Sequence, residues 1–551
     1  MEGCNPLTRF AAGCWPRSDR CFKMSPKRNP QETQAWLVGG GIASLAAAVH
    51  LLKKAKVPAH QIHILDIRHS SGGAMKSSGN CVDGYVLHTG ALPYLRGQCV
   101  ADLLSMVPSA ASPAMSYLQD IKYYECYTRP INRAHTRAIK RSDDGIQRLD
   151  EHQLRVGAKI RRQLVRFLFD GERFLEAKQI DDIFDDSFFV SEFWALWSTT
   201  FLLQPWHSAI EFHRLLVKHL PDMNTENDVR RLERTQFSLY ESLVFPIAAF
   251  LKDEGVDFHF HTVVTDIKMY PEGDPRTVRN MVLTEQGKER AITVAPNDIV
   301  IVTLGSLSTG WKTGSNDEHP QSPSPLLLGP EWTLWQRLHE QSPRFGDPTV
   351  FSSRVAESTI ETFTITLREA DFFKNYSRLT QDKPGTGALL TVLGSPWGLN
   401  ISVPSQPIFR TQPNDIYVIW GYALQPDQTG AYVSKPMKQC SGREILLELL
   451  SHLGFPTEQI LSSATTIPCL VPLGTSVLLS RKENDRPRVV PHGTTNIAFV
   501  GQYVEIPGDT TFGVEYSVRG AAMAVHTLMG STHSPPAVRR SKLLEVFELL
   551  C

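Results

Sequence analysis

The feature that most constrains the fold is a glycine turn between an apolar run and an alanine-rich stretch. The segment AWLVGGGIASLAAAVHLLKKA begins at Ala35 and contains Gly39, Gly40 and Gly41, and a second apolar run, IHILD, ends at Asp66. Short apolar runs on either side of a helical pattern predict strand, turn, helix and strand in that order. We therefore expect a βαβ unit of the Rossmann type.

This unit has the residues of a dinucleotide site. Gly39 permits a tight turn, Gly41 lets backbone N–H groups approach a pyrophosphate, and the small Ser44 takes the third fingerprint position. The following helix directs its positive end at the pyrophosphate, and Asp66 follows the second strand, where a carboxylate accepts ribose hydroxyls. The alternative is a tight turn with no ligand. The same glycines argue against a membrane span over Ala35–Leu52, so we expect no transmembrane helix.

Other turns extend the candidate cofactor site. The pair Gly72 and Gly73 is similar to the pair with which flavoproteins having two dinucleotide-binding domains approach their cofactor, although an ordinary loop is the alternative. TLGS and GQYVEIPGDTTFGVEYS follow apolar strands, as do flavin-contacting segments in those proteins. No second GxGxxG occurs, so a nicotinamide site is not expected. The further candidate cofactor contacts are Gly72, Gly73, Thr303, Gly305, Ser306, Gly501, Thr511 and Phe512.

Composition excludes several classes of protein. The 551 residues are 42% apolar and 21% charged, which fits a globular chain with a large core. The 57 basic and 57 acidic residues cancel, so net charge gives no attraction to nucleic acid. The nine cysteines form no CxxC pair or zinc-like cluster, so we expect no metal and no disulfide framework, and a reducing, cytoplasmic location.

The expected fold class is α/β, with a Rossmann-type FAD-binding core, a β-rich substrate domain and an inserted helical region. Alternating patterns in TFTITL, ALLTVL, LNISV and DIYVIWGYAL predict a meandering antiparallel sheet in the substrate domain. The expected divisions are a disordered leader (1–34), the FAD-binding βαβ unit and flavin loop (35–97), a mainly helical region (98–245), a return to the FAD-binding domain (246–310), the β-rich substrate domain (311–480), the end of the FAD-binding core (481–530) and an amphipathic tail (531–551).

The tail sequence AVRRSKLLEVFELLC mixes apolar and basic residues. Two interpretations are open. It is a docking helix against this protein or a second copy, as in a homodimer, or an interfacial helix that makes a peripheral membrane contact.

Several segments together resemble one family. They are WHSAIEFHR (206–214), YESLVFPI (240–247), QPIFRTQPNDIYVIWGYAL (406–424) and DRPRVVPHGTTNIAFVGQYVEIPGDTTFGVEYSVRGAAMAV (485–525). The chain resembles the oleate hydratases, flavoproteins once called myosin-cross-reactive antigens, over roughly 35–530. The resemblance implies an FAD-binding core, a fatty-acid channel, and addition of water to a cis double bond of an unsaturated fatty acid without net redox turnover.

Hydration of an isolated alkene needs a proton donor and an activated water, because the intermediate resembles a carbocation. The family's tyrosine segment usually reads YNQYES, whereas this chain has FSLYES and so lacks one of the two tyrosines. Tyr240 is the candidate proton donor, and a packed aromatic is its alternative. The family's catalytic glutamate falls at Leu92, in GYVLHTGAL. The residues that could replace this base are His88, Asp83 and Glu241.

The family holds the fatty carboxylate with a threonine and nearby polar groups. The matching segment PLGTSVLLSR retains Thr475, and Arg481 is a candidate bidentate partner for a carboxylate, with a solvated surface arginine as its alternative. His207 and Glu211 lie at i and i+4, a spacing that can ligate metal, but without a third ligand we interpret them as a structural pair.

Four functions follow from these residues. A fatty acid hydratase is the first. A double-bond isomerase is the second, because isomerisation needs no activated water and leucine at position 92 accepts no proton. A non-catalytic, flavin-bound lipid carrier would bind fatty acid without turnover, and a redox oxidase or desaturase would bleach its flavin on mixing with substrate.

Overall fold

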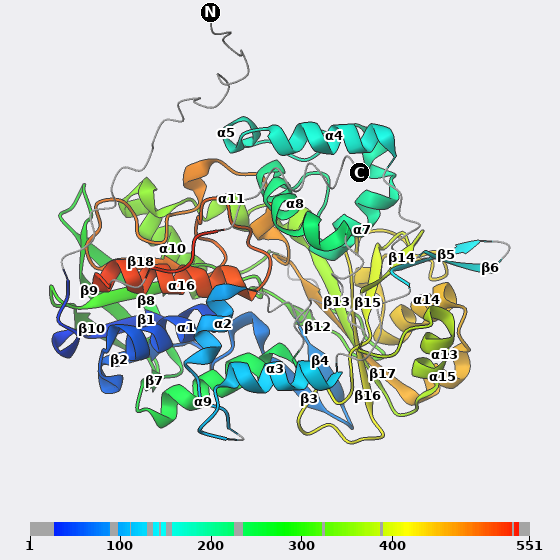
Figure 1. Ribbon diagram of the computed structural model, residues 1–551, viewed down its shortest axis with the longest axis horizontal. Helices are drawn as coiled ribbons and strands as arrows, with labels where there is room; N and C mark the ends of the chain where they lie inside the picture. The colour runs from blue at the N-terminus through cyan, green and yellow to red at the C-terminus, as the bar shows by residue number, and fades with distance from the viewer. Residues whose placement is uncertain are drawn as a thin grey trace, which may run out of the picture.

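The computed structural model describes residues 27–88, 97–110, 112–128, 136–142, 145–149, 157–224, 235–321, 325–385, 389–531 and 534–538 (Figure 1). Its first sheet is parallel and has the order β18-β11-β1-β2-β7. The expected βαβ unit is confirmed, since β1 pairs in parallel with β2 and with β11. The strands are β1 (Ala35–Val38), β2 (Ile62–Leu65), β7 (Asp257–His259), β11 (Ile299–Thr303) and β18 (Ile497–Val500).

Two helices pack side by side on this sheet, α1 (Ile42–His50) and α16 (Val514–Met529) (Figure 1). Every residue of α1 is buried, including the three consecutive alanines 46–48. Small side chains let two helices approach closely, which explains the alanine-rich sequence after the glycine turn. Both helices point their N-termini at the same cavity, described below.

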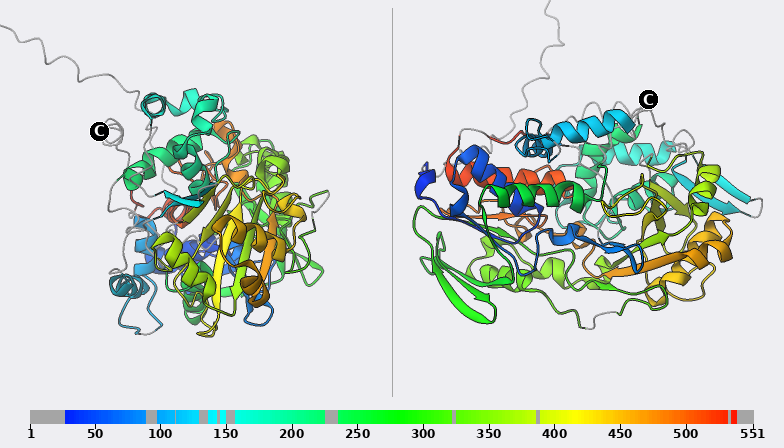
Figure 2. Two further views of the ribbon diagram at one scale, coloured as in Figure 1. Left: turned by 90° about the vertical axis from the view of Figure 1, so that its right-hand side faces the viewer. Right: turned by 90° about the horizontal axis from the view of Figure 1, so that it is seen from below.

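A three-stranded antiparallel sheet, β10-β9-β8, forms the end of the molecule opposite to β5 and β6 (Figures 1 and 2). Its strands are β8 (Thr262–Tyr270), β9 (Thr277–Glu285) and β10 (Lys288–Thr293). The segment 256–270 is divided at His261, whose φ is +54°. Because of this turn, β7 joins the parallel sheet and β8 the antiparallel one.

The second large sheet has eight strands in the order β12-β17-β13-β16-β15-β14-β5-β6. The four strands expected from alternation are present, and β14, β15, β16 and β13 pair antiparallel in that order. Helices α13, α14 and α15 pack on one face through a common apolar cluster. The strands are β5 (Ala138–Ser142), β6 (Gly145–Leu149), β12 (Lys312–Thr313), β13 (Ile360–Leu367), β14 (Leu389–Leu393), β15 (Leu399–Ser402), β16 (Tyr417–Ala423) and β17 (Ala464–Val471).

The region 98–245, expected to be mainly helical, contains the β5–β6 hairpin, and β5 pairs in parallel with β14. A smaller hairpin, β3 (Ser77–Asn80) with β4 (Gly84–Leu87), precedes it. The remaining helices are α2 (Gln98–Ser105), α3 (Tyr117–Thr128), α4 (Ala158–Phe169), α5 (Glu172–Leu175), α6 (Asp186–Phe189), α7 (Glu192–Phe201), α8 (Ala209–Asn224), α9 (Phe245–Asp253), α10 (Pro330–Gln341), α11 (Thr349–Ser352), α12 (Val355–Ser358), α13 (Asp371–Thr380), α14 (Gly442–Leu453) and α15 (Thr457–Ser463).

Residues 27–34, which the sequence assigned to a disordered leader, lie on the core. The buried Arg28 donates to the carbonyls of Thr495 and Leu528. Leu92 and residues 539–551 of the tail lie outside the described residues. Among the helices that the structure describes, none has both the length and the apolar character needed to cross a bilayer.

Candidate functional site

A cavity of about 340 Å³ runs from the glycine turn to the eight-stranded sheet. One end is formed by residues 38–43, the segment after β11, the segment after β18, and the start of α16. The other end is formed by residues on or beside the large sheet. These are Ile360, Thr362, Trp420, Tyr422, Val471, Gly474, Val477 and Leu478.

The glycine turn leaves open space where a ligand would approach. Gly39 has a φ of +101°, which side chains rarely adopt. A Cβ added to Gly41 would meet no atom within 4 Å, although Gly41 lines the cavity. The backbone of Gly41 is therefore exposed to the cavity in the way a pyrophosphate site requires.

The second glycine pair packs onto the first turn. The Gly72 N–H donates to the Gly40 carbonyl at 2.9 Å, and a Cβ on Gly73 would lie 3.3 Å from the Gly41 Cα. Both residues have positive φ and both line the cavity. The loop thus brings two glycine segments to the same wall.

Asp66 braces this wall and lines the cavity. Its carboxylate accepts the Gly40 N–H at 2.5 Å and the Arg68 N–H at 2.7 Å, and the residue is 5% exposed. Burial raises the pKa of Asp66, while the N–H donors and Arg68 act in the opposite direction. Each carboxylate oxygen has two lone pairs, so these bonds leave capacity for ribose hydroxyls.

The remaining candidate cofactor contacts meet at the same cavity, except Ser44. Thr303, Gly305, Ser306, Gly501, Thr511 and Phe512 all line it. Ser44 does not, and its hydroxyl is instead 3.0 Å from the Thr303 hydroxyl. Ser44 therefore acts by holding β11 against α1.

The donor set fits a dinucleotide. The N-cap residues of α1 and α16 are Gly41 and Gly513, and neither provides a side-chain cap, so N–H groups at both N-termini have no side-chain acceptor there. The buried Thr511 Oγ1 lacks a hydrogen-bond partner within the described part of the chain. Two helix N-termini and an orphaned hydroxyl on one cavity favour an anionic ligand with further polar groups.

Tyr240 lies beside the cavity and is not one of its lining residues. A Cβ on Gly72 would fall 2.8 Å from the Tyr240 ring, whereas the preceding Leu239 reaches the cavity. The Tyr240 hydroxyl bonds Ser70, and burial raises the pKa of the phenol. At neutral pH the phenol therefore carries the proton that a general acid needs.

His88 lies behind the opposite end of the cavity. Its ring is 3.8 Å from the Trp311 ring between centroids, and its carbonyl accepts from the Thr362 hydroxyl. The His88 Nδ1 is 3.6 Å from the Cys469 Sγ, yet burial lowers the pKa of His88 to about 4 and raises that of Cys469 to about 12. These shifts favour a neutral imidazole and a neutral thiol, which is not an activated nucleophile pair.

The other two candidate bases are engaged elsewhere. Glu241 accepts the Arg410 N–H at 2.7 Å, and burial raises the pKa of its carboxyl. Asp83 accepts from the Asn80 amide in the exposed β3–β4 turn. Neither carboxylate lines the cavity.

The two residues expected to bind a substrate carboxylate have structural partners instead. The buried Thr475 hydroxyl donates to the Ser358 carbonyl at 3.2 Å. Arg481 is 4% exposed, and its Nη2 is 2.8 Å from Glu211 and 2.9 Å from Glu505. Arg481 is thus neither a surface arginine nor a guanidinium directed at the cavity.

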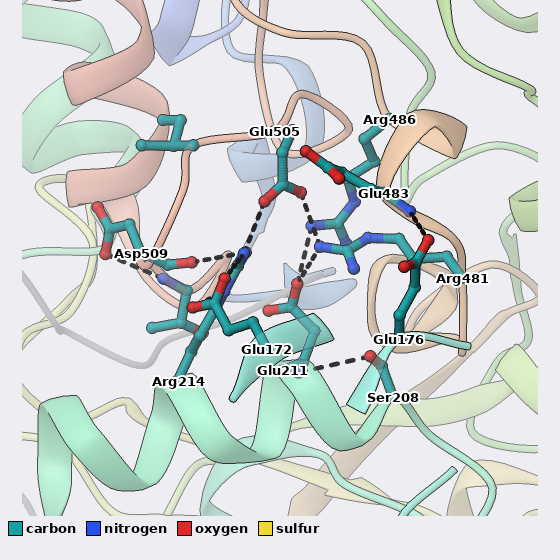
Figure 3. Close-up of polar contacts among 12 residues, drawn as sticks. Glu172, Glu176, Ser208, Glu211, Arg214, Arg481, Glu483, Arg486, Glu505 and Asp509 are labelled. Atoms are coloured by element: carbon teal, nitrogen blue, oxygen red, sulfur yellow. Dashed lines mark hydrogen bonds and ion pairs between the residues drawn. The ribbon is translucent and has the colours of Figure 1, made fainter. Parts of the chain in front are cut away.

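Arg481 belongs to a buried ion cluster that joins α8 to the loops before and after β18 (Figure 3). Glu211 accepts from Arg481 and from Arg486 at 2.9 Å, and Arg214 bridges Glu172 and Glu505. Burial would raise the pKa of Glu505, but Arg481 and Arg214 outweigh it and lower the pKa to about 2. The cluster continues through Lys218, Asp509, Arg519 and Glu515.

His207 and Glu211 do not share a ligand site. His207 is fully buried just before α8, and its Nδ1 accepts the Gln204 N–H at 3.0 Å. Burial lowers the pKa of His207 to about 3, so its neutral ring serves packing. This arrangement agrees with the structural interpretation, although the partner of Glu211 is an arginine pair that sequence spacing did not reveal.

Comparison with known proteins gives consistent matches over nearly the whole chain. The MCRA family matches residues 32–526. An oleate hydratase of Streptococcus pyogenes serotype M49 (strain NZ131) is 32% identical over 517 residues, covering 92% of this chain and 86% of that protein. A linoleate hydratase of Lactiplantibacillus plantarum is 26% identical over 541 residues, covering 91% and 94% respectively.

Solved structures match at lower similarity. An oxidoreductase from Methanosarcina mazei has a TM-score of 0.49 and 12% identity, with 88% of this chain and 98% of that chain covered. A putrescine oxidase bound to putrescine has a TM-score of 0.49 and 11% identity, with 90% and 99% covered.

Proposed function

Because the chain belongs to the MCRA family, we propose that it is an FAD-binding hydro-lyase that adds water to a double bond of an unsaturated long-chain fatty acid. The related oleate and linoleate hydratases favour this substrate class. No net redox change is required, since hydration adds the elements of water and leaves the oxidation state of the whole molecule unchanged.

The observation that carries the proposal is the continuity of the cavity. Its first end has the glycine turns and helix N-termini that suit a dinucleotide. Its second end is walled by side chains such as Ile360, Val471 and Leu478, which suit an acyl chain. A double bond held between these ends would be next to the residues that would hold FAD.

FAD would be held by the backbone of Gly41, Gly72 and Gly73, by Asp66, and by Thr511 in the loop before α16. When bound, the flavin supplies a planar polar surface beside the alkene without turning over as a redox group. The apolar wall excludes bulk water, which protects a cation-like transition state from competing reactions. Tyr240 would supply the proton from the side of Gly72.

The test is product analysis in ¹⁸O-labelled water. FAD-loaded protein is incubated with a panel of cis-unsaturated fatty acids, and hydration places the label in a new hydroxyl group. Tyr240→Phe should lower turnover by about 100-fold or more. Tyr270→Phe is the matched control, because Tyr270 is an exposed tyrosine of β8. Unchanged turnover in Tyr240→Phe would remove this residue from the mechanism.

A double-bond isomerase is the second candidate. Among the described residues, the only carboxylates lining the cavity are Asp66 and Glu331. Asp66 accepts from Gly40 and Arg68, and Glu331 accepts from the Thr309 hydroxyl at 2.6 Å. The leucine at position 92 cannot act as a base. The described residues that line the cavity therefore include no carboxylate that is free to activate water. An unlabelled product with a moved double bond would support isomerisation.

A non-catalytic lipid carrier is the third candidate. It predicts fatty-acid binding without product, which the same incubations would reveal. Flavin bleaching under anaerobic mixing with substrate would instead favour an oxidase or desaturase.

A further inference from the structure

Strand β7 forms one edge of the parallel sheet and pairs with β2 (Figure 1). A cluster of two histidines and an aspartate lies on these two strands. His63 and Asp257 are paired in register, and His259 follows Asp257 on the same face of β7. One ligand atom from each residue lies within 4.8 Å of the other two.

The cluster is accessible to a small ion. His63, Asp257 and His259 line a separate cavity of about 130 Å³ between β2, β7 and the β8–β10 sheet. The Asp257 side chain is 46% exposed, so an ion can enter from solvent. Glu285 and Arg290 also line the cavity, and their opposite charges offset each other, which leaves the Asp257 charge to attract a cation.

His63 cannot donate a hydrogen bond in both of its side-chain contacts. The His63 Nε2 is 2.9 Å from the Gln34 Oε1, and its Nδ1 is 3.0 Å from the Asp257 Oδ2. Both partners are acceptors as placed, but a neutral imidazole has only one N–H. If that N–H donates to Gln34, the Nδ1 lone pair faces the carboxylate.

The same Asp257 oxygen is 2.7 Å from the His259 Nε2. Three ligand atoms therefore converge from two adjacent strands. Gln34 contacts the His63 Nε2, the ring nitrogen that faces away from Asp257, and so orients the ring. The outer partners of metal-binding histidines commonly have this role. Trp36 also stacks on His63, with centroids 4.1 Å apart, and fixes the ring plane.

We propose that His63, Asp257 and His259 bind a divalent transition metal ion of the Zn²⁺ class, with water from the adjoining cavity completing the coordination. Imidazole nitrogen and carboxylate oxygen are ligands that suit Zn²⁺ and Co²⁺. The site is distinct from the FAD cavity and does not depend on the proposed hydration.

The ion would stabilise the strand edge that carries Asp66. The His259 carbonyl accepts the Asp66 N–H at 2.9 Å, and the Asp66 carbonyl accepts from Thr262. Joining His63 of β2 to two ligands of β7 would hold an edge strand of three residues in place. Metal binding should therefore raise the melting temperature of the protein.

The experiment uses the full-length protein after treatment with a chelator. Zn²⁺ binding is measured by competition with a chromophoric chelator, and Co²⁺ is added separately as a spectroscopic probe. We expect roughly one ion per chain, a visible Co²⁺ band of a low-symmetry N,O site, and a rise in melting temperature. His63→Gln, His259→Gln and Asp257→Asn should each weaken Zn²⁺ binding by at least about 10-fold.

His319→Gln is the matched control, because His319 is an exposed histidine outside the cluster. Circular dichroism identifies any variant that fails to fold. Asp257→Asn is nearly isosteric and lies at an exposed edge, so it remains informative if a histidine variant does not fold. If Zn²⁺ does not bind the wild type, or binds all four variants equally, the proposal is wrong. The contacts would then be explained by a flipped Gln34 amide or by a protonated His63.

Discussion

At the residue scale, Gly41 and Gly171 are matched in backbone and differ in what lies beside them. Each glycine immediately precedes a helix and has a φ near −78°, and a Cβ added to either would meet nothing within 4 Å. Gly41 faces the main cavity and Gly171 is exposed. We predict that Gly41→Val lowers FAD affinity by at least about 10-fold, because the valine side chain occupies the pyrophosphate position.

The measurement is flavin fluorescence during titration of apoprotein with FAD. Gly171→Val should bind FAD like the wild type, and both variants should melt within a few degrees of the wild-type apoprotein. If Gly41→Val binds FAD normally, the pyrophosphate is not at the glycine turn.

Sequence predicts a single residue well when its role is local. The positions of Gly39 and Gly41 in a turn before a helix could be predicted, because a turn and a helix start both depend on neighbouring residues. Arg481 could not, because its partners Glu211 and Glu505 come from α8 and from the loop after β18. His63 and His259 are missed for the same reason, since only strand pairing brings them together.

At the element scale, the ion cluster fastens α8 to the loops around β18, one of which leads to the cavity-lining Thr511 (Figure 3). Glu211 is fully buried and holds two arginines. We predict that Glu211→Gln lowers the apparent free energy of unfolding by about 3–5 kcal/mol, because it leaves the buried Arg486 without its carboxylate partner and Arg481 with Glu505 alone.

Urea unfolding measures this change. Glu289→Gln is the control, because Glu289 is exposed on β10 and its substitution should change stability by no more than about 0.5 kcal/mol. Equal effects from the two variants would mean that the cluster contributes no net electrostatic stability.

The cluster also predicts a dependence of stability on acid pH. The pKa of Glu505 is about 2 in the folded protein against an ordinary 4.5, so its ionised form is stabilised by folding. Its contribution is complete above about pH 4.5 and is lost as the pH falls toward 2. The stability difference between wild type and Glu505→Gln should therefore shrink over this interval.

Denaturant midpoints of the two proteins, compared at several pH values, test this dependence. The difference between wild type and Glu289→Gln provides the baseline and should stay nearly constant. A Glu505 difference that does not change with pH would contradict the ion pairing with Arg481 and Arg214.

Elements with strong apolar alternation were predictable, and elements without it were not. The strands β13 to β16 were expected because their alternating apolar side chains face a core. The hairpin β5–β6 was not, because β6 has no fully buried residue and lies at the sheet edge. Its position depends on the parallel pairing of β5 with β14, a contact between distant segments.

At the scale of the whole molecule, the two sheets meet at one cavity, so its two ends should be separable by mutation. Val477 lines the end of the cavity next to the eight-stranded sheet, and Gly41 lines the end next to the glycine turn. We predict that Val477→Phe raises the KM for long-chain acids by about 10-fold and shifts preference to shorter ones, because the added ring shortens the acyl space. FAD affinity should change by less than about twofold, since no cofactor contact is altered.

Val477→Ala supplies the opposite change, because it enlarges the same end and should favour longer or bulkier acids. Steady-state kinetics over a series of chain lengths, with FAD titrations of the same preparations, measure both effects. Together with Gly41→Val, these variants test whether a change at one end of the cavity affects only FAD and a change at the other end only the fatty acid. If Val477→Phe instead abolishes FAD binding and leaves the KM for the acid unchanged, the acyl chain does not occupy that end, and the two-ended cavity is not the basis of the activity.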